Sequence, residues 1–594
     1  MLVVPEAARA VTVAGLVELS RRRPVVVAVP AASDAERLAA DLEAFLPASS
    51  VELFPAWETL PFERVSPSIE TMGRRLRTMW RLRSGDESLA VVVAPARALV
   101  QRLGPQVEHV EPIVLRRDGH LDSTELVEQL VAAGYRREYQ VEHRGEVAVR
   151  GSIIDVFPST ADAPVRIDLW GDEVDRLFEF SVADQRATVE LDEVHVFPAR
   201  ELLPTEEVRA RAERLVATEP WGREQWQRIA DGEAFEGMEA WLAWLAEGEH
   251  VLFDLVPDSG QILLAEPRRL RDRAGDIAAE EVDLAEALSR TWDLSDTSDL
   301  PRLHVDFDRL LRHTGAPVWS LAGVPDSPES PAVAALAWPP AVGEATALLQ
   351  QLRQLLDDEH TVVVCADGAG SAARIEKLLA EHGFSFPVLD EVPSAAELRG
   401  PGGRIVVAPL ERGCILPGVR LALLSEADLS GRRRTHRAAR TPKRDAQRFF
   451  EDLRVGDHVV HQVHGVARFE GMVKRAMGGV ERDYLLLEYR GGDKLYVPSD
   501  QIDSIKLYSG GETPKLNKMG GADFSRTKAK VRSAVAEIAQ ELVVLYQKRV
   551  ATPGHAFSPD TPWQRELELA FPYQETPDQL LAIEAVKADM ESPV

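Results

Sequence analysis

Two stretches of the chain alternate short apolar runs with helical patterns, and this alternation limits the folds they can adopt. In residues 1–115 the runs Pro24–Val29 and Leu89–Ala94 are typical of buried strands, and Asp34–Phe45 is typical of a helix. Residues 341–430 repeat the theme with three predicted strands, Thr361–Cys365, Ile405–Ala408 and Leu421–Leu424. Strands that alternate with helices indicate layered α/β domains, so each stretch is predicted to be one.

The length and composition predict several intracellular domains. A chain of 594 residues is too long for one hydrophobic core. No apolar run approaches the length of a membrane span, and the N-terminus has no secretory pattern. Cys365 and Cys414 are too few for a disulfide framework or a thiolate metal cluster, so we expect a reducing cytoplasm. The net charge of −27 limits any nucleic-acid contact to local patches.

Between the two α/β stretches the pattern changes. Residues 116–200 predict a small α+β insert, with a helix opened by Asp122 and Glu125 and with the strands Val147–Val149, Ser152–Val156 and Val165–Leu169. Residues 201–340 return to helical and α/β patterns and are predicted to be the second half of the first domain. The segment Leu53–Phe62 is aromatic but broken by prolines, and it is expected to pack on the surface of that domain.

The C-terminal third has a different organisation. Residues 431–449 are basic and favour a solvated linker over the alternative of a nucleic-acid patch. Residues 450–515 predict a small β-barrel, with the strands Asp457–Val463, Tyr484–Tyr489 and Lys494–Val497 separated by glycine turns. In residues 516–556 apolar positions recur at helical spacing and predict a long amphipathic connector helix: Val531, Val535, Ile538, Leu542 and Leu545. The fold class is therefore multidomain α/β with an added β-barrel.

The chain contains no complete catalytic site that its sequence reveals. No Gly-x-x-x-x-Gly-Lys-Ser/Thr loop occurs, so ATP turnover is not expected and no catalytic residue is assigned. The glycine-rich turn Asp367–Ser371 lacks the third glycine of a dinucleotide fingerprint and favours an ordinary strand-to-helix turn. His458, His461 and His464 point to alternating faces of a strand and lack further ligands, so no metal site is predicted.

The N-terminal motifs resemble those of a known protein family. Leu53–Phe62, Ser66-Pro67, the helix at Arg74-Arg75-Leu76 and Val91–Pro95 resemble the N-terminal domain shared by the excision-repair protein UvrB and the transcription-repair coupling factors. The UvrB domain carries a phosphate-binding loop. The stretch taken as equivalent here, Val13–Glu18, lacks the lysine and a second glycine, which favours the coupling factors with their degenerate site.

The insert extends this resemblance. Arg150–Pro158 and Arg166–Glu173 look like the UvrA-binding domain of both families, which implies that Arg150, Arg166 and Trp170 face UvrA. Exposed arginine and tryptophan are also the residue types that dominate binding hot spots. A solvated strand face without a partner is the alternative.

The predicted barrel resembles the RNA-polymerase-interaction domain of coupling factors and CarD-type regulators, a Tudor-like fold. The resemblance rests on Val459–Phe469, Tyr484–Tyr489 and Leu495–Pro498. It implies docking on the polymerase β subunit by strand pairing. Val473, Lys474 and Arg475 are the candidate contacts, with plain surface residues as the alternative.

The segment Phe571–Gln579 resembles the opening of RecG-like superfamily-two motors, in which the aromatic and the glutamine contact adenine. Phe571 and Gln579 would thus be half of a nucleotide site in residues 557–594, and the remaining motifs would lie beyond Val594. The favoured function is the N-terminal part of a coupling factor, whose full-length form would use ATP and Mg²⁺ to translocate on double-stranded DNA. The alternatives are a UvrB-like DNA helicase or ATPase and a CarD-like transcription regulator.

Overall fold

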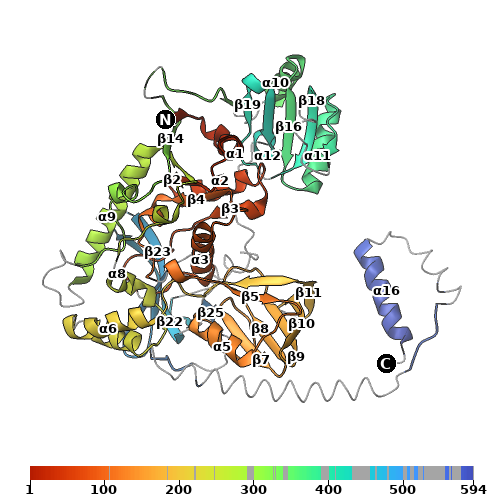
Figure 1. The fold of residues 1–594 in the computed structure, drawn as a ribbon. Helices are drawn as coiled ribbons and strands as arrows, with labels where there is room; N and C mark the ends of the chain where they lie inside the picture. Colours follow the sequence, from red (N-terminus) through yellow and green to blue (C-terminus); the bar gives the residue numbers. More distant parts are fainter. Residues whose placement is uncertain are drawn as a thin grey trace. The chain divides into compact units, whose positions relative to one another are not determined.

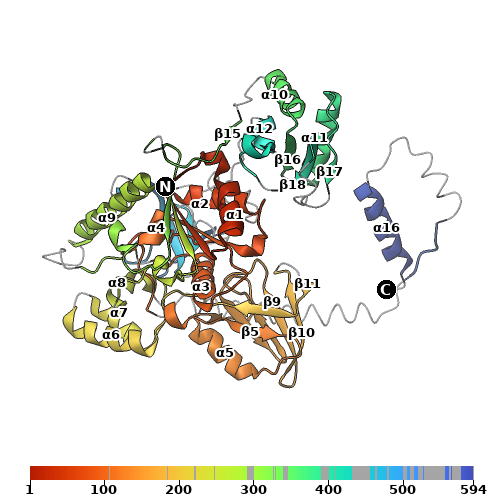
Figure 2. The same ribbon diagram turned by 45° about the horizontal axis from the view of Figure 1, so that its top comes forward.

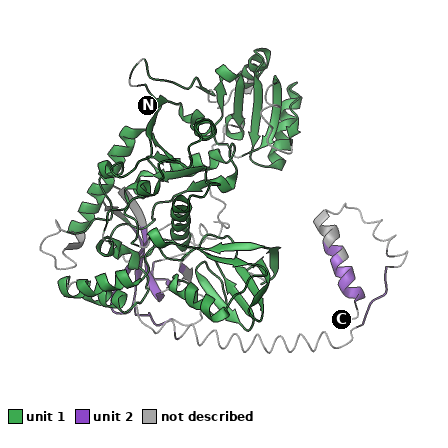
Figure 3. Ribbon diagram, viewed as in Figure 1, with its two compact units in different colours: residues 1–443, 474–482 green, residues 444–473, 483–594 purple. Residues whose placement is uncertain are grey.

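The computed structural model describes most of the chain. It covers residues 1–289, 300–338, 345–389, 400–430, 455–508, 514–518, 526, 555–560, 564 and 577–592, with short gaps at 64, 106, 183–184, 220–221, 247, 326, 328, 409, 462–463, 478–479 and 499–504. The chain divides into two compact units (Figure 3). The first contains residues 1–443 and 474–482, and the second contains residues 444–473 and 483–594.

The first domain is built on a parallel six-stranded sheet (Figure 1). In spatial order its strands are β1 (Leu2–Val3), β14 (Val318–Ala322), β13 (Gln261–Ala265), β2 (Val25–Val29), β4 (Val91–Pro95) and β3 (Val51–Leu53). Every residue of β2, β4 and β13 is buried, because helices cover both faces of the sheet, and apart from Gln261 these strands are apolar throughout. Strands from both predicted halves, residues 1–115 and 201–340, therefore share one sheet.

Helices complete this domain on the two faces of the sheet. One apolar cluster contains α1 (Arg9–Ser20) and α2 (Ala32–Leu42) together with the odd-numbered valines of β2. The opposite cluster contains α3 (Ile69–Ser84), α4 (Ala96–Val100) and α9 (Pro267–Ser289), together with Val26 and Ala28. The strand and helix predictions for residues 24–29, 34–45 and 89–94 are thus confirmed, apart from one to three residues at the ends.

The prediction for Leu53–Phe62 is wrong about exposure. Phe54, Trp57 and Phe62 are all buried. Trp57 and Phe62 belong to an aromatic cluster with three tryptophans of the helical part of this domain, which includes α6 (Glu206–Thr218), α7 (Arg223–Ala230) and α8 (Leu242–Leu245). The prolines prevent a regular element, but large aromatic side chains gain most when they are removed from water.

The placement of the degenerate phosphate loop is also wrong. Val13–Glu18 lies inside α1, and Gly15 is a mid-helix residue. A phosphate loop joins the end of a strand to the start of a helix, whereas α1 leads into β2. The topologically matching connection is the short one between β2 and α2, where Ala31 is the N-cap and Asp34 makes the first turn acidic. An acidic first turn disfavours phosphate.

The insert packs a six-stranded sheet against α5 (Ser123–Ala132). Asp122 caps this helix by accepting hydrogen bonds from the backbone N–H groups of Thr124 and Glu125, as its sequence predicts. In spatial order the strands are β11 (Ala187–Glu190), β10 (Glu173–Phe180), β9 (Val165–Trp170), β8 (Ile153–Val156), β7 (Glu146–Arg150) and β6 (Arg136–Arg137). A separate pair, β5 (Ile113–Arg116) with β12 (Glu193–Val196), forms the entry and exit.

Two consecutive residues join the exit of the insert to the first domain. Arg200 donates to the Glu239 carboxylate at 2.9 Å. Glu201 accepts a bidentate pair of bonds from Arg75 at 2.8 and 3.0 Å and a third bond from Trp57 Nε1 at 2.7 Å. Glu201, Arg75 and Glu239 are fully buried or nearly so.

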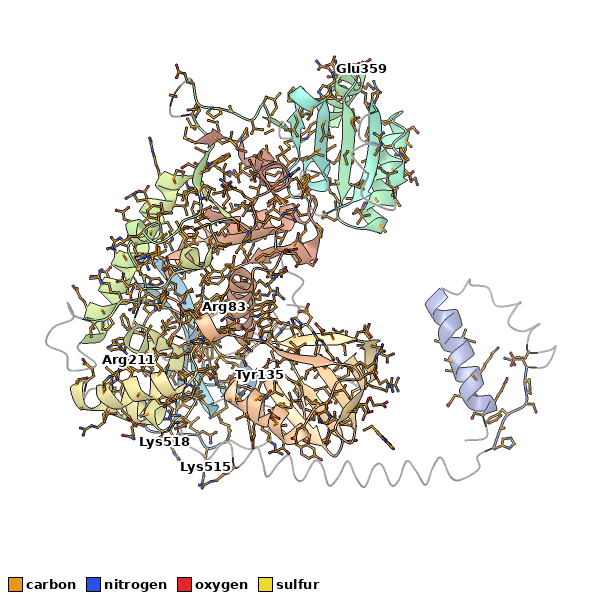
Figure 4. The ribbon with its side chains drawn as sticks, viewed as in Figure 1. Arg83, Tyr135, Arg211, Glu359, Lys515 and Lys518 are labelled. Carbon is orange, nitrogen blue, oxygen red and sulfur yellow. The ribbon has the colours of Figure 1, made fainter. Side chains whose placement is uncertain are left out.

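Helix α3 also meets the insert closely, because a Cβ on Gly73 would lie 2.5 Å from Ser159 Oγ. Nearby, Tyr135 donates its hydroxyl to the Phe197 carbonyl and accepts from Ser159 N (Figure 4).

The third domain has a mixed sheet whose two faces are covered differently (Figure 2). Its order is β15 (Leu336–Ala337), β19 (Cys414–Leu416), β20 (Leu421–Ser425), β16 (Thr361–Ala366), β18 (Gly402–Val407) and β17 (Val388–Leu389). Helices α10 (Ala345–Asp357) and α11 (Ala369–Glu381) cover one face, while Val363, Cys365 and Cys414 on the other join the apolar cluster of α1 and α2. The predicted strands are confirmed, and both cysteines are free thiols.

Residues predicted as a barrel form a five-stranded antiparallel sheet, the C-terminal sheet. Its order is β24 (Lys494–Pro498), β23 (Val480–Glu488), β22 (Gly465–Met477), β21 (His458–His461) and β25 (Ile505–Leu507). Gly491 and Gly492 turn the β23–β24 hairpin with φ values of 102° and 85°, which glycine adopts without strain.

Asn517 fastens the following segment to the C-terminal sheet. It gives its N–H to the Val466 carbonyl at 2.9 Å, accepts the Val466 N–H on Oδ1 at 2.7 Å, and accepts the Arg490 N–H at 2.9 Å. Lys515 and Lys518 on either side of it are exposed (Figure 4).

Two predicted segments lie outside the described residues, the basic linker 431–449 and nearly all of the connector helix 516–556. The last described helix is α16 (Pro577–Glu591). Within the described part of the chain, no helix combines the length and apolar character needed to span a bilayer.

Candidate partner-binding surfaces

Arg150, Arg166 and Trp170 share one face of the insert sheet. Arg166 and Trp170 lie an even number of residues apart in β9, so their side chains leave the strand on the same side. Ile153 pairs with Arg150 in β7 and with Asp168 in β9, which places Arg150 on this side too. The opposite side is the core of the insert. The three predicted contact residues are therefore brought together.

Their exposure differs. Trp170 is 82% exposed, an unusual position for the largest apolar side chain. The Arg150 side chain is 36% exposed and that of Arg166 only 14%. Only Trp170 is fully offered to a partner.

Asp155 of β8 joins the two arginines beneath this face, and its side chain is completely buried. Its Oδ1 accepts from Arg166 Nε at 2.6 Å, and its Oδ2 accepts from Arg166 Nη2 at 2.9 Å and also from Arg150 Nη2. The hydrogen bonds to Asp155 raise the pKa of Arg166, so its charge is permanent. Sequence reasoning did not single out Asp155, although one carboxylate in the apolar strand Ile153–Val156 was a usable signal.

Val473 and Lys474 lie on β22 in the C-terminal sheet. Val473 is half-buried and Lys474 is exposed, whereas the Arg475 side chain lies outside the described residues. Strand β21 pairs with β22 from Gly465 to Arg468, and two more backbone hydrogen bonds join Phe469 to Gly456 and Asp457. Residues 470–477 of β22, its projecting part, extend past this register. Such a projecting strand carries backbone groups that a partner strand can pair with.

Two of the three histidines of the C-terminal sheet, the buried His461 and the half-buried His464, stack on each other, whereas their sequence spacing predicts alternating faces. The His461 and His464 rings lie 4.8 Å apart between centroids, and the His464 N–H donates to His461 Nδ1 at 3.2 Å. Burial lowers the pKa of His461 to about 3, with a further contribution from His464. No metal-binding group of three His, Cys, Asp or Glu residues occurs within the described residues. The pair is therefore a neutral packing element at pH 7.

The turn Asp367–Ser371 follows β16 and enters α11, as its sequence predicts. The carboxylate of Glu426 occupies the N-terminus of that helix, where it accepts from Ser371 Oγ at 2.9 Å and from the Asp367 N–H at 3.3 Å. Burial raises the pKa of Glu426, but these hydrogen bonds outweigh it and the net shift is downward. A phosphate at this helix would meet an anion, which favours the ordinary turn.

The partial nucleotide site cannot be located. Phe571 lies outside the described residues, and the Gln579 side chain on α16 does too.

Family models match three segments of the chain. The UvrB interaction domain matches residues 113–202, which are the insert. The D3 domain of MFD matches residues 355–429 of the third domain. The CarD-like/TRCF RID domain matches residues 453–509, the C-terminal sheet.

Relatives cover the whole chain. Transcription-repair-coupling factors of Mycobacterium tuberculosis and Bacillus subtilis are 38% and 30% identical to it, over 100% and 96% of its length. That of Staphylococcus haemolyticus is 28% identical over 94%. The chain spans 51%, 50% and 49% of these three relatives, or about half of each. Along its whole length, the chain is thus homologous to transcription-repair-coupling factors.

Proposed function

We propose that this chain is the docking part of a transcription-repair coupling factor. The insert binds UvrA and the C-terminal sheet binds RNA polymerase, so that the repair machinery reaches a stalled polymerase. The observation that carries the proposal is the outward face of the insert, where the 82% exposed Trp170 stands beside two arginines anchored on a buried carboxylate. An exposed aromatic next to fixed cations is the usual composition of a protein-binding hot spot.

The polymerase contact uses the projecting part of β22. Pairing of a polymerase β-subunit strand with β22 would supply main-chain hydrogen bonds, and Val473, Lys474 and Arg475 would add side-chain selectivity. The match of residues 453–509 to the CarD-like/TRCF RID domain supports this choice of partner.

The full-length protein is a translocase that uses ATP and Mg²⁺ on double-stranded DNA and displaces polymerase at lesions. Phe571 and Gln579 belong to its adenine site. The 594 residues contain no Gly-x-x-x-x-Gly-Lys-Ser/Thr loop, so we expect no DNA-stimulated phosphate release from this chain. Release above background from the purified chain would favour the UvrB-like ATPase instead.

Titration calorimetry with purified UvrA tests the insert. Trp170→Ala removes the exposed anchor and is expected to weaken binding by about 30-fold or more. Tyr139→Ala is the matched control, because Tyr139 is also an exposed aromatic of the insert, at 63%. Equal affinities for the two variants would show that this face does not bind UvrA.

A pull-down with the polymerase β subunit tests the C-terminal sheet. Lys474→Glu reverses a charge on the projecting strand and should reduce capture, while Lys494→Glu on β24 is the control for an exposed lysine elsewhere in the sheet. Undiminished capture by a chain lacking residues 450–515 would refute the assignment.

A further inference from the structure

The carboxylate of Asp155 has no access to a partner, yet it holds both cations of the proposed UvrA face. It lies opposite Arg166 in β9 and opposite Ala148 in β7. Ala148 belongs to a small apolar cluster with Phe157, Phe178 and Phe180, so the carboxylate lies at the edge of a low-dielectric region. A buried carboxylate there requires compensation by charged donors.

The two arginines use this carboxylate differently. Arg166 donates hydrogen bonds from Nε and Nη2 to Asp155. It also donates from Nη1 to the Gln185 carbonyl and from Nη2 to the Gln185 side chain. Its guanidinium lies 4.4 Å from the centre of the Phe180 ring. Its donors are directed inward and its side chain is mostly covered. Arg166 therefore has little left to offer a partner.

Arg150 keeps most of its donors. Among side chains that the structure describes, it bonds only to Asp155, through a single Nη2 contact. The remaining N–H groups of a guanidinium lie in one plane, so fixing one nitrogen restricts the direction of the others. The side chain is more than twice as exposed as that of Arg166 and lies on the same face as Trp170.

We propose that Asp155 is a positioning residue that aims Arg150 at a carboxylate of the partner, and that Arg166 braces Asp155 rather than touching the partner. The inference rests on the proposed UvrA contact and divides its face into three roles. Trp170 is the apolar anchor, Arg150 is the donor, and the Asp155–Arg166 pair is the support. Holding the donor in place before binding reduces the ordering entropy that binding must overcome.

The test is a double-mutant cycle measured with UvrA by calorimetry. Asp155→Asn keeps the shape but removes the charge that holds both arginines, and we expect binding to weaken by roughly tenfold. The same substitution in an Arg150→Ala background should have no further effect, because the residue through which it acts is gone. Glu128→Gln removes an exposed carboxylate on α5, which packs on the opposite side of the sheet, and as the control it should change affinity little.

The outcomes separate the inference from the function on which it rests. Unchanged or tighter binding by Asp155→Asn, or an equal loss with and without Arg150, would overturn the positioning role even if Trp170→Ala still weakens binding as expected. If Trp170→Ala is also harmless, the face itself is wrong.

If Asp155→Asn lowers the melting temperature so far that the insert unfolds, Arg166→Met replaces it in the cycle, because it removes the ion pair that braces Asp155 and keeps the carboxylate that holds Arg150. The same dependence on Arg150 is then expected, and a loss of affinity that persists without Arg150 would overturn the proposal.

Discussion

Replacing Glu201 by Gln should destabilise the first domain more than any surface charge change. Glu201 receives three hydrogen bonds, two from Arg75 and one from Trp57, and the side chains of both members of the ion pair are at most 1% exposed. Arg75 also lies 4.3 Å from the centre of the Phe54 ring. A glutamine fits the same space, but it leaves the Arg75 charge buried without a counter-charge.

Breaking a buried ion pair from one side costs about 3–5 kcal/mol. Glutamine retains one acceptor oxygen for Arg75 or Trp57, which recovers about 1 kcal/mol. We therefore expect a loss of about 2–4 kcal/mol in the free energy of unfolding. The half-buried i,i+4 pair Arg74–Glu70 on the neighbouring surface of α3 is worth only about 0.3–0.5 kcal/mol.

Urea unfolding followed by tryptophan fluorescence measures the loss in the free energy of unfolding, because one buried cluster of the first domain holds Trp57, Trp226, Trp241 and Trp244. Glu70→Gln is the matched control. An equal loss in the free energy of unfolding for the two variants, or a loss below about 1 kcal/mol for Glu201→Gln, would refute the reasoning.

Three further predictions concern other parts of the chain. Asn517→Ala removes the acceptor of the Val466 N–H and should speed trypsin cleavage after Lys515 about fivefold. Gly73→Ala should lower stability by about 1–3 kcal/mol, since the new Cβ would lie 2.5 Å from Ser159 Oγ. His461 has a folded pKa of about 3, so only the unfolded state gains a proton below pH 6.5, and acidification from pH 7 to 5 should cost the C-terminal sheet about 2 kcal/mol.

Each of these has a control in the chain. Asn517→Asp keeps the acceptor, so trypsin should cleave this variant after Lys515 at the original rate. Gly15→Ala meets no atom within 4 Å in the middle of α1 and should raise the melting temperature that Gly73→Ala lowers. His461→Gln should reduce the acid sensitivity of hydrogen exchange in residues 458–469, after correction for intrinsic rates, and the remainder is expected from His464, whose pKa burial also lowers. An undiminished sensitivity would assign it to another group.

Strand and helix identities in the α/β domains could be predicted because their patterns are local. Valine runs such as Val25–Val29 can be satisfied only in a strand covered on both faces, and Asp122 can cap a helix whatever surrounds it. The first sheet, however, pairs Val25 with Gln261 and Val91, and no local pattern encodes a partner more than two hundred residues away.

The two wrong predictions, for Val13–Glu18 and for Leu53–Phe62, both depend on which side chains are buried. The residue types of Val13–Glu18 do not distinguish a degenerate phosphate loop from a helix, whereas Val13 and Val17 are spaced for the buried face of the helix α1. The prolines of Leu53–Phe62 indicate correctly that no regular element forms. They say nothing about burial, which is decided by the distant tryptophan cluster that receives Trp57 and Phe62.

At the candidate site, alternation along β9 was enough to place Arg166 and Trp170 on one face. The depth of each side chain was not predictable, because Arg166 is covered by Gln185 and Phe180, which come from other segments. The role of Asp155 depends on the register between β7, β8 and β9, which a single sequence leaves open.

The adjacent residues Arg200 and Glu201 have a mechanical consequence. To swing the insert about its exit, Arg200 and Glu201 would both have to leave their buried partners in the first domain, and breaking the fully buried Glu201–Arg75 pair alone costs several kcal/mol. Spontaneous breakage of both ion pairs is therefore expected to be rare, so the insert and the first domain should move together at this joint. A partner bound at Trp170 would then be held in a fixed orientation to the parallel sheet.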